Sequence, residues 1–187
     1  MNLNYTFEQA ETDSQNYYFY KNGFDKSELD KIEKGVAKIE FQKATIVGGD
    51  VEKQRSSRIK WIPQSDEWFW LYEKLSNFAK EANNSLWHFD LQSLPEQIQY
   101  TEYLGTNKGH YDWHADIGPG MLSKRKVSIT VQLSHPDEYK GGDLELFRGG
   151  SMEGPFEKAE RNQGCVFLFP SYTMHRVTPV TKGIRKS

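Results

Sequence analysis

The sequence predicts a mainly β protein of the α+β class, a double-stranded β-helix (jelly roll) with supporting N-terminal helices. Two observations predict this fold. Short apolar or alternating runs, separated by Gly, Pro, Asn and Asp, fill the second half of the chain. Two segments with helical spacing of apolar residues lie in the first half. Many short strands after two helices are typical of a jelly-roll barrel that the helices support.

The chain has 187 residues and contains no repeat, low-complexity tract or clear linker. This length predicts a single domain with one sizeable core. Within residues 1–187 we expect a helix-rich support region over 1–95 and a jelly-roll core over 96–187.

The support region is expected to contain a short aromatic strand and two helices. The strand candidate spans residues 17–20. Asp25 and Glu28 have the spacing of a capping box and predict a helix from about 27 to 38. A second helix is expected over about 66–81. Its apolar stripe, which is typical of core packing, consists of Trp68, Leu71, Leu75, Phe78 and Ala82.

The second half of the chain is expected to consist of short strands. Their expected ranges are 97–104, 111–116, 126–134, 143–147, 164–169 and 175–178, with a last strand that opens at 184. Successive side chains of a strand point to opposite faces. In the strand over 126–134, one face is therefore apolar (Val127, Ile129, Val131 and Leu133) and the other polar (Ser128, Thr130, Gln132 and Ser134).

Composition and charge narrow the class of partner. The chain has 24 Lys+Arg against 26 Asp+Glu, a formal net charge of -2, so no basic excess points to nucleic acid. No apolar stretch has the length of a membrane span, and residues 1–13 lack the features of a signal peptide. Cys165 is the only cysteine, which excludes an intramolecular disulfide and a cysteine-based metal cluster. We therefore expect a cytoplasmic protein with neither nucleic acid nor a membrane as partner; the oligomeric state is left open.

A candidate metal site comes from His114, Asp116 and His175. On a strand, His114 and Asp116 share a face and can present an imidazole and a carboxylate to one ion. His175, after an apolar strand and a turn, is the best candidate for a third ligand. Two histidines and one carboxylate form the facial triad of non-haem Fe(II) oxygenases, which leaves coordination positions open for substrates.

Spacing alone leaves alternatives for these ligands. His110 and Asp112 form a second H-x-D triplet of the same parity as His114 and Asp116. His88 and His135 are not excluded by spacing either; we interpret His88, His110 and His135 as structural or surface residues.

Arg185 is the candidate for binding an anion beside the metal. Turn-forming residues separate it from His175. A hairpin centred near Val180 would place His175 and Arg185 opposite each other on paired strands, with both side chains on one face. A permanently charged guanidinium close to a metal is suited to a ligand carboxylate.

The chain from about residue 100 resembles the prolyl 4-hydroxylase-like 2-oxoglutarate/Fe(II) oxygenases, and within them the PKHD-type hydroxylases. The matching segments are 103–105, 111–116, 125–134, 141–147, 164–170 and 175–185. The family spacing, in which the ligand H-x-D follows Y-x-G by about ten residues, selects His114 and Asp116. The resemblance further implies that His175 is the distal ligand and that Arg185 pairs with the far carboxylate of 2-oxoglutarate.

Two more cofactor-binding candidates and two departures follow from the resemblance. Tyr103 matches a tyrosine that commonly lines the cosubstrate pocket. Gln132 stands where some relatives carry a tyrosine that contacts the same carboxylate, and its strand predicts that it points into the barrel. The chain ends two residues after Arg185, whereas relatives continue through a further strand, so weaker support of Arg185 is expected.

The implied activity is hydroxylation of a C–H bond with Fe(II), 2-oxoglutarate and O2, releasing succinate and CO2, with ascorbate as a further cofactor candidate. The expected substrate is a prolyl or lysyl side chain of a protein or peptide, or else a small molecule. Trp113, Lys124 and Arg125 either border the mouth of the site or form an ordinary polar rim. The alternatives are a metal-dependent hydrolase and a non-catalytic jelly-roll binding module.

Overall fold

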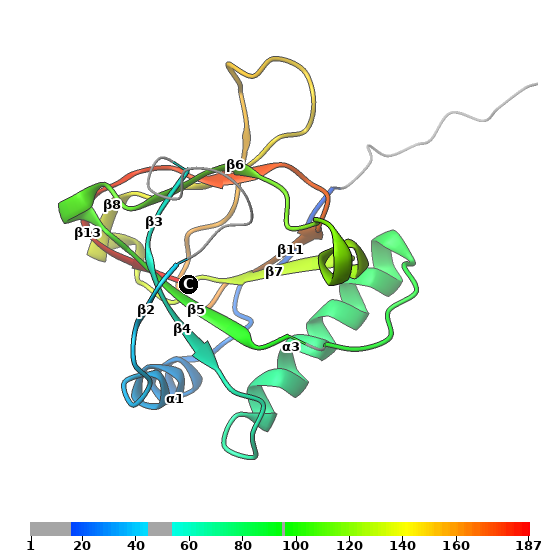
Figure 1. The fold of residues 1–187 in the computed structure, drawn as a ribbon, viewed down its shortest axis with the longest axis horizontal. Helices are drawn as coiled ribbons and strands as arrows, with labels where there is room; N and C mark the ends of the chain where they lie inside the picture. The colour runs from blue at the N-terminus through cyan, green and yellow to red at the C-terminus, as the bar shows by residue number, and fades with distance from the viewer. Residues whose placement is uncertain (1–15, 45–53, 95) are drawn as a thin grey trace, which may run out of the picture.

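The computed structural model describes residues 16–44, 54–94 and 96–187, and within them the strands form three antiparallel sheets (Figure 1). The first sheet contains, in spatial order, β1 (Tyr18–Tyr20), β11 (Val166–Pro170) and β7 (Val127–Val131). The second contains β10 (Glu157–Lys158), β9 (Leu144–Leu146), β12 (His175–Val177), β6 (His110–His114) and β3 (Arg55–Ser56). The third contains β2 (Gln42–Lys43), β4 (Arg58–Ile62), β5 (Ile98–Leu104), β13 (Val180–Lys186) and β8 (Tyr139–Gly141).

The predicted mainly β class is confirmed, and both expected helices are present. They are α1 (Lys26–Val36) and α3 (Phe69–Ala82), which lie on one side of the sheets (Figure 1). The Asp25–Glu28 capping box begins α1, with both reciprocal hydrogen bonds formed. A π-helical turn, η1 (Asn83–Trp87), extends α3. Three 3-10 turns, η2 (Gly105–Asn107), η3 (Gly120–Lys124) and η4 (Pro136–Glu138), connect strands. No helix of the described residues is long and apolar enough to cross a membrane.

Two apolar clusters explain why the helices and the barrel hold together. The first joins the helices to the sheets and contains Ile32 of α1, Leu71 and Leu75 of α3, and Val166 of β11. The second fills part of the barrel interior and contains Phe167 and Phe169 among others. Because alternate residues of β11 enter different clusters, this strand is buried on both faces. The apolar face of β7 likewise packs on the first cluster, as its alternation predicts.

The N-terminal region contributes strands to all three sheets, through β1, β3 and the pair β2–β4. Of these, the sequence indicated only β1. The sequence of β4 does not show the alternation of a strand, because the charged residue Lys60 is buried on it. Its ammonium donates to the carbonyl of Val36 at the end of α1, at 2.7 Å, and lies 4.1 Å from the centroid of the Phe41 ring. A cation at a helix C-terminus is favourable, and here it substitutes for an apolar side chain.

The predicted hairpin between His175 and Arg185 is wrong. Strand β12 pairs with β6 and β9, whereas β13 pairs with β5 and β8, in a different sheet. The last strand also begins at Val180 rather than at Ile184. Arg185 is opposite Tyr103 in this pairing, and its side chain is 1% exposed. The expectation that Arg185 is weakly supported is therefore also wrong, because β13 has partners on both sides.

Gly183 lets β13 approach β8 closely enough to place Arg185. Its φ is +74°, and a Cβ atom there would lie 1.9 Å from the carbonyl oxygen of Glu138. We expect Gly183→Ala to lower the free energy of unfolding by at least about 2 kcal/mol, since the left-handed backbone penalty and the clash add. Gly120→Ala is the control, because Gly120 has a φ of +64° but nothing within 4 Å of its Cβ position. Equal losses for the two variants in urea unfolding would contradict the clash.

Candidate metal centre and anion pocket

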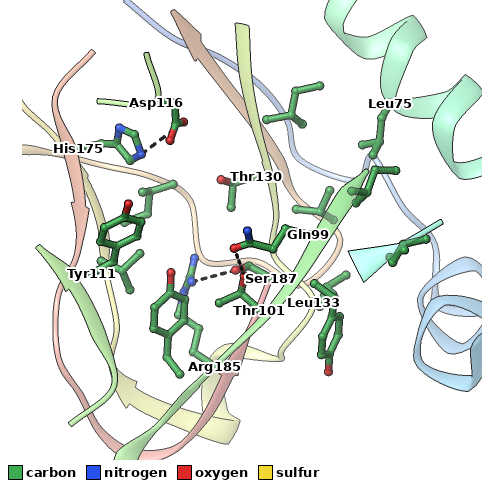
Figure 2. Close-up of a pocket in the computed structure, with 18 of the residues that line it drawn as sticks. Leu75, Gln99, Thr101, Tyr111, Asp116, Thr130, Leu133, His175, Arg185 and Ser187 are labelled. Carbon is green, nitrogen blue, oxygen red and sulfur yellow. Dashed lines mark hydrogen bonds and ion pairs between the residues drawn. The ribbon is translucent and has the colours of Figure 1, made fainter. Parts of the chain in front are cut away.

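The structure brings together the three side chains that were predicted to bind a metal. One ligand atom each from His114, Asp116 and His175 lies within 4.8 Å of the others. The Nε2 atom of His114 is 3.7 Å from Oδ1 of Asp116, and Nε2 of His175 is 3.6 Å from Oδ2 (Figure 2). His114 and His175 are opposite each other on β6 and β12, with ring centroids 4.1 Å apart. Strand pairing therefore sets the spacing of the two imidazoles.

A β-bulge in β6 separates the two H-x-D triplets that parity could not distinguish. His175 pairs with His114 and Val177 with Tyr111, so three residue steps on β6 oppose two on β12. The rings of Tyr111 and His114 consequently lie on the same face and stack at 3.4 Å. Asp112 is exposed to solvent on the bulged segment. The bulge thus directs His114, and not Asp112, into the barrel.

Hydrogen bonds orient both imidazoles with Nε2 toward Asp116. The Nδ1 atom of His114 lies 2.7 Å from the carbonyl oxygen of Asp112, and that of His175 lies 2.9 Å from the carbonyl of Thr173. Because a carbonyl only accepts, each Nδ1 carries the proton and each Nε2 presents its lone pair. Burial, and then the neighbouring His175, lower the pKa of His114 to about 4. His114 is therefore neutral near pH 7, the form that binds a metal.

Asp116 is held by residues from three other segments. Ser128 on β7 donates to its Oδ2 at 2.5 Å, and the Oγ atom of Ser171 lies 3.0 Å from the same Ser128 hydroxyl. The backbone N–H of Asp116 donates to the Ser171 carbonyl at 2.9 Å. Arg125 donates to the Asp116 carbonyl at 2.9 Å, while Glu96 accepts two 2.8 Å hydrogen bonds from the same guanidinium. Arg125, for which the sequence left open the mouth of the site or a polar rim, thus supports the ligand. Ser128 lies on the polar face predicted for its strand, whereas no sequence pattern indicated a role for Ser171.

A cavity of about 260 Å³ leads from the three ligands to Arg185. In Figure 2, Asp116 and His175 lie together, Arg185 and Ser187 lie apart from them, and Leu133 and Leu75 lie farther away still. Tyr111 and Thr130 also line the cavity. His175 on β12 and Arg185 on β13 come from different sheets. His175 and Arg185 therefore meet through the barrel interior rather than through a hairpin.

Arg185 is a buried cation without a carboxylate partner among the described residues. It donates to Oε1 of Gln132 at 3.0 Å and to Oγ of Ser187 at 3.2 Å, and its Nε has no hydrogen-bond partner. The guanidinium carbon lies 5.4 Å from the centroid of the Tyr103 ring. A buried charge that only neutral groups contact is costly, so this end of the cavity is suited to an anion.

Tyr103 and Gln132 occupy different places around Arg185. Tyr103 lines the cavity, as expected for a residue beside the cosubstrate. Gln132 is 2% exposed and points inward, but it does not line the cavity. It accepts from Arg185 and donates to the carbonyl oxygen of Glu160 at 3.1 Å. Gln132 therefore orients the Arg185 guanidinium and does not itself face the cavity.

We expect Gln132→Leu to destabilise the protein by about 1–3 kcal/mol, because the Arg185 guanidinium loses a buried acceptor. Affinity for 2-oxoglutarate, measured by calorimetry with Mn(II) present, should fall as well. Gln132→Glu is the informative comparison. The introduced carboxylate should pair with Arg185, so the Gln132→Glu protein should have a higher unfolding midpoint than Gln132→Leu. Because this carboxylate occupies the guanidinium, it should also compete with 2-oxoglutarate for Arg185 and lower the affinity for it. A Gln132→Leu protein with unchanged stability and unchanged affinity would contradict this role.

The remaining sequence candidates lie outside the cavity. His88 is exposed, and His135 is the N-cap residue of η4. The Nδ1 atom of His110 lies 2.9 Å from the carbonyl oxygen of Lys108. Trp113 packs on Phe156, with ring centroids 4.8 Å apart, and does not line the cavity. Lys124 is exposed at the end of η3.

The donor set fits a divalent transition metal together with a dicarboxylate. Two imidazoles and one carboxylate on one side of an ion leave its other side open toward the cavity. Arg185, which lines the same cavity and has an unpartnered Nε, is suited to a second anionic group of the same ligand.

Comparison with known proteins agrees with this geometry. Residues 98–187 match the sequence profile of the 2OG-Fe(II) oxygenase superfamily. A PKHD-type hydroxylase of Teredinibacter turnerae is 37% identical over 99 residues, which cover 50% of this chain and 42% of the relative. One of Pseudoalteromonas atlantica is 31% identical over 70% of this chain and 59% of its own length. The chain spans about half the length of the curated relatives it matches.

Solved structures share the fold at low sequence identity. A prolyl hydroxylase of Trichoplax adhaerens, in complex with a hypoxia inducible factor peptide fragment, has a TM-score of 0.72 and 18% identity; the match covers 91% of this chain and 80% of that one. A viral collagen prolyl hydroxylase from Paramecium Bursaria Chlorella virus-1 has a TM-score of 0.63 and 20% identity, covering 95% of each chain. These likenesses support the jelly-roll fold.

Proposed function

We propose that the protein, whose residues 98–187 match the 2OG-Fe(II) oxygenase superfamily, is an Fe(II)- and 2-oxoglutarate-dependent dioxygenase that hydroxylates a C–H bond. The observation that carries the proposal is one cavity that both the candidate metal ligands, His114, Asp116 and His175, and the buried Arg185 line. Neither the set of metal ligands nor the buried arginine is specific for an oxygenase by itself. Together they match a ligand that has a metal-chelating end and a distant carboxylate.

His114, Asp116 and His175 would hold Fe(II), and Arg185 would bind the far carboxylate of 2-oxoglutarate. Fe(II) with 2-oxoglutarate and O2 supplies an oxidant that inserts one oxygen atom into a C–H bond, while the cosubstrate becomes succinate and CO2. The contribution of the protein is to hold the metal ligands and the cosubstrate in position. Ser128 and Arg125 hold Asp116 in position, and the Nδ1 hydrogen bonds keep both imidazoles in the binding tautomer. Tyr103 lies against the guanidinium that receives the carboxylate.

The substrate that we propose is a prolyl or lysyl side chain of a protein or peptide. Two similarities support it. Curated relatives are PKHD-type hydroxylases, and a prolyl hydroxylase with a related fold is known in complex with a peptide. Ile117, Tyr172 and Met174, which are close in sequence to the three ligands, are 43%, 60% and 37% exposed. Such exposed apolar side chains are suited to contact a peptide.

Two other functions make different predictions from the same residues. A metal-dependent hydrolase needs a general base beside a metal-bound water, and its mechanism does not require a buried arginine that lines the cavity. A binding module without activity would keep the fold but need not bind 2-oxoglutarate. Binding of metal and cosubstrate, followed by oxygen-dependent turnover, separates the three.

The test is anaerobic addition of Fe(II) and then 2-oxoglutarate, followed in the visible spectrum. We expect a weak charge-transfer band that needs both additions, and succinate after air is admitted, with and without ascorbate. A protein that binds Fe(II) but shows neither band nor succinate is not an oxygenase of this type. Peptides containing proline or lysine, screened for a mass increase of one oxygen atom, then identify the substrate.

A further inference from the structure

Arg55 is a second buried guanidinium on the cavity, and neither the metal nor 2-oxoglutarate accounts for it. This residue, the first of β3, is 8% exposed and lines the cavity. Its Nε donates to Oγ of Ser57 at 2.8 Å and its Nη2 donates to Oε1 of Gln99 at 2.5 Å. The guanidinium carbon lies 4.6 Å from the centroid of the Tyr111 ring.

The surroundings of Arg55 repeat those of Arg185. Each guanidinium donates to the side-chain oxygen of one glutamine, and each lies over a tyrosine ring that lines the cavity. Among residues 16–44, 54–94 and 96–187, no ion pair includes either arginine. Among the described residues, only neutral groups therefore contact these two cations, and each cation is more than nine-tenths buried. A buried charge without a counter-ion is unfavourable, so each position is suited to an anionic ligand group.

The proposed cosubstrate cannot supply both anions. One carboxylate of 2-oxoglutarate would bind the metal with the keto oxygen, and the other would bind Arg185. Arg55 thus remains for a third anionic group, which must come from another molecule in the cavity. In an oxygenase of this type, that molecule is the substrate that is hydroxylated.

Arg55 is placed to hold such a substrate near the metal. The Tyr111 ring that it contacts stacks on the imidazole of His114 at 3.4 Å. Only one aromatic ring therefore separates the guanidinium from a metal ligand. A substrate whose carboxylate binds Arg55 would have carbon atoms a few bonds away beside the metal.

We propose that Arg55 binds a carboxylate of the substrate and selects substrates that carry an acidic group close to the hydroxylated carbon. This inference rests on the proposed function and adds an acidic group, on a peptide or on a free amino acid, to the description of its substrate. The carboxylate has two possible sources, the α-carboxylate of a free or C-terminal amino acid and the side chain of an aspartate or glutamate in a peptide.

Matched probe pairs test the proposal without turnover. Mn(II) and 2-oxoglutarate are bound to the protein, and the Mn(II) broadens proton signals of any probe that lies near it. The first pair is L-proline and L-prolinamide. The second pair is two capped peptides, one with aspartate beside proline and one with asparagine there. We expect the carboxylate member of one pair to bind at least about tenfold more tightly than its amide, and that pair identifies the source.

Three variants assign the preference to Arg55. Arg55→Met should remove it and leave affinities for Mn(II) and 2-oxoglutarate within about threefold, whereas Arg55→Lys should keep part of it. Arg58→Met is the control, since Arg58 pairs with Glu102 and does not line the cavity. If Arg55→Met does not fold, Arg55→Lys and the affinities of the wild-type protein for the two probe pairs still test the proposal.

Two results would overturn the inference. One is a wild-type protein that binds Mn(II) and 2-oxoglutarate but does not prefer any carboxylate over its amide. The other is an Arg55→Met protein that loses 2-oxoglutarate as Arg185→Met does, which would place Arg55 in the cosubstrate site. Failure of the wild type to bind Mn(II) or 2-oxoglutarate would instead refute the proposed function. Saturation transfer from the metal-free protein to the same pairs then decides whether Arg55 binds carboxylates.

Discussion

Replacing Asp116 with alanine is expected to abolish metal binding at micromolar concentrations. Asp116 offers the only carboxylate of the candidate metal site among the described residues, and its oxygens lie within 3.7 Å of both imidazole Nε2 atoms. Loss of a group that merely supports a ligand lowers metal affinity by about 10–100-fold. Loss of the charged ligand itself should exceed that range. Titration with Mn(II), followed by electron paramagnetic resonance of the free ion, measures the change.

The alternative H-x-D triplet provides the matched control for this experiment. Asp112→Ala and His110→Ala change the same residue types on β6, which ends at His114 shortly before Asp116, but the bulge in β6 keeps Asp112 exposed. Both variants should bind Mn(II) as the wild type does. Asp112→Ala removes no hydrogen bond from the His114 ring, because the backbone carbonyl of residue 112 accepts it. Retained binding in Asp116→Ala, or lost binding in Asp112→Ala, would show that the metal site is assigned to the wrong triplet.

Arg185→Met should abolish 2-oxoglutarate binding and leave Mn(II) bound. Hydrogen bonds to charged groups contribute about 1.5–3 kcal/mol each, so loss of a two-point contact with a carboxylate should weaken binding by at least about a hundredfold. Methionine fills much of the same volume without a charge. We therefore expect the apoprotein to be as stable as the wild type or more stable, since a buried cation without a counter-ion is removed.

Thermal unfolding provides a second measurement of the Arg185 variant. With Mn(II) present, 2-oxoglutarate should raise the Tm of the wild type, because a ligand that binds only the folded state stabilises it. The Arg185→Met protein should show no such rise, and Arg185→Lys should show a smaller one, because an ammonium lacks the planar pair of donors. An Arg185→Met protein that binds 2-oxoglutarate normally would assign the far carboxylate to another residue, for which Arg55 is the first candidate.

Local patterns in the sequence were sufficient for the elements that depend on neighbours along the chain. The Asp25–Glu28 capping box and the apolar stripe of α3 are such patterns, and both are formed. The alternation of β7 is another; it places Ser128 against Asp116 and Thr130 in the cavity. Short strands with buried charged residues were missed. In β4 the buried charge is balanced by the end of α1, which is far away in the sequence.

The sequence by itself determined which residue types are available for chemistry: two histidines, one aspartate and one arginine, in family order. Only the tertiary structure decided how they meet. The bulge in β6 changes which residues of that strand face the barrel interior, so His114 and Asp112 no longer share a face. Strands β12 and β13, which carry His175 and Arg185, pair in different sheets. Arg55 reaches the cavity because β3 pairs with β6, between residues 55 and 111. Register, sheet partners and burial follow from packing between distant segments, whereas strand and helix periodicity follow from the local backbone alone.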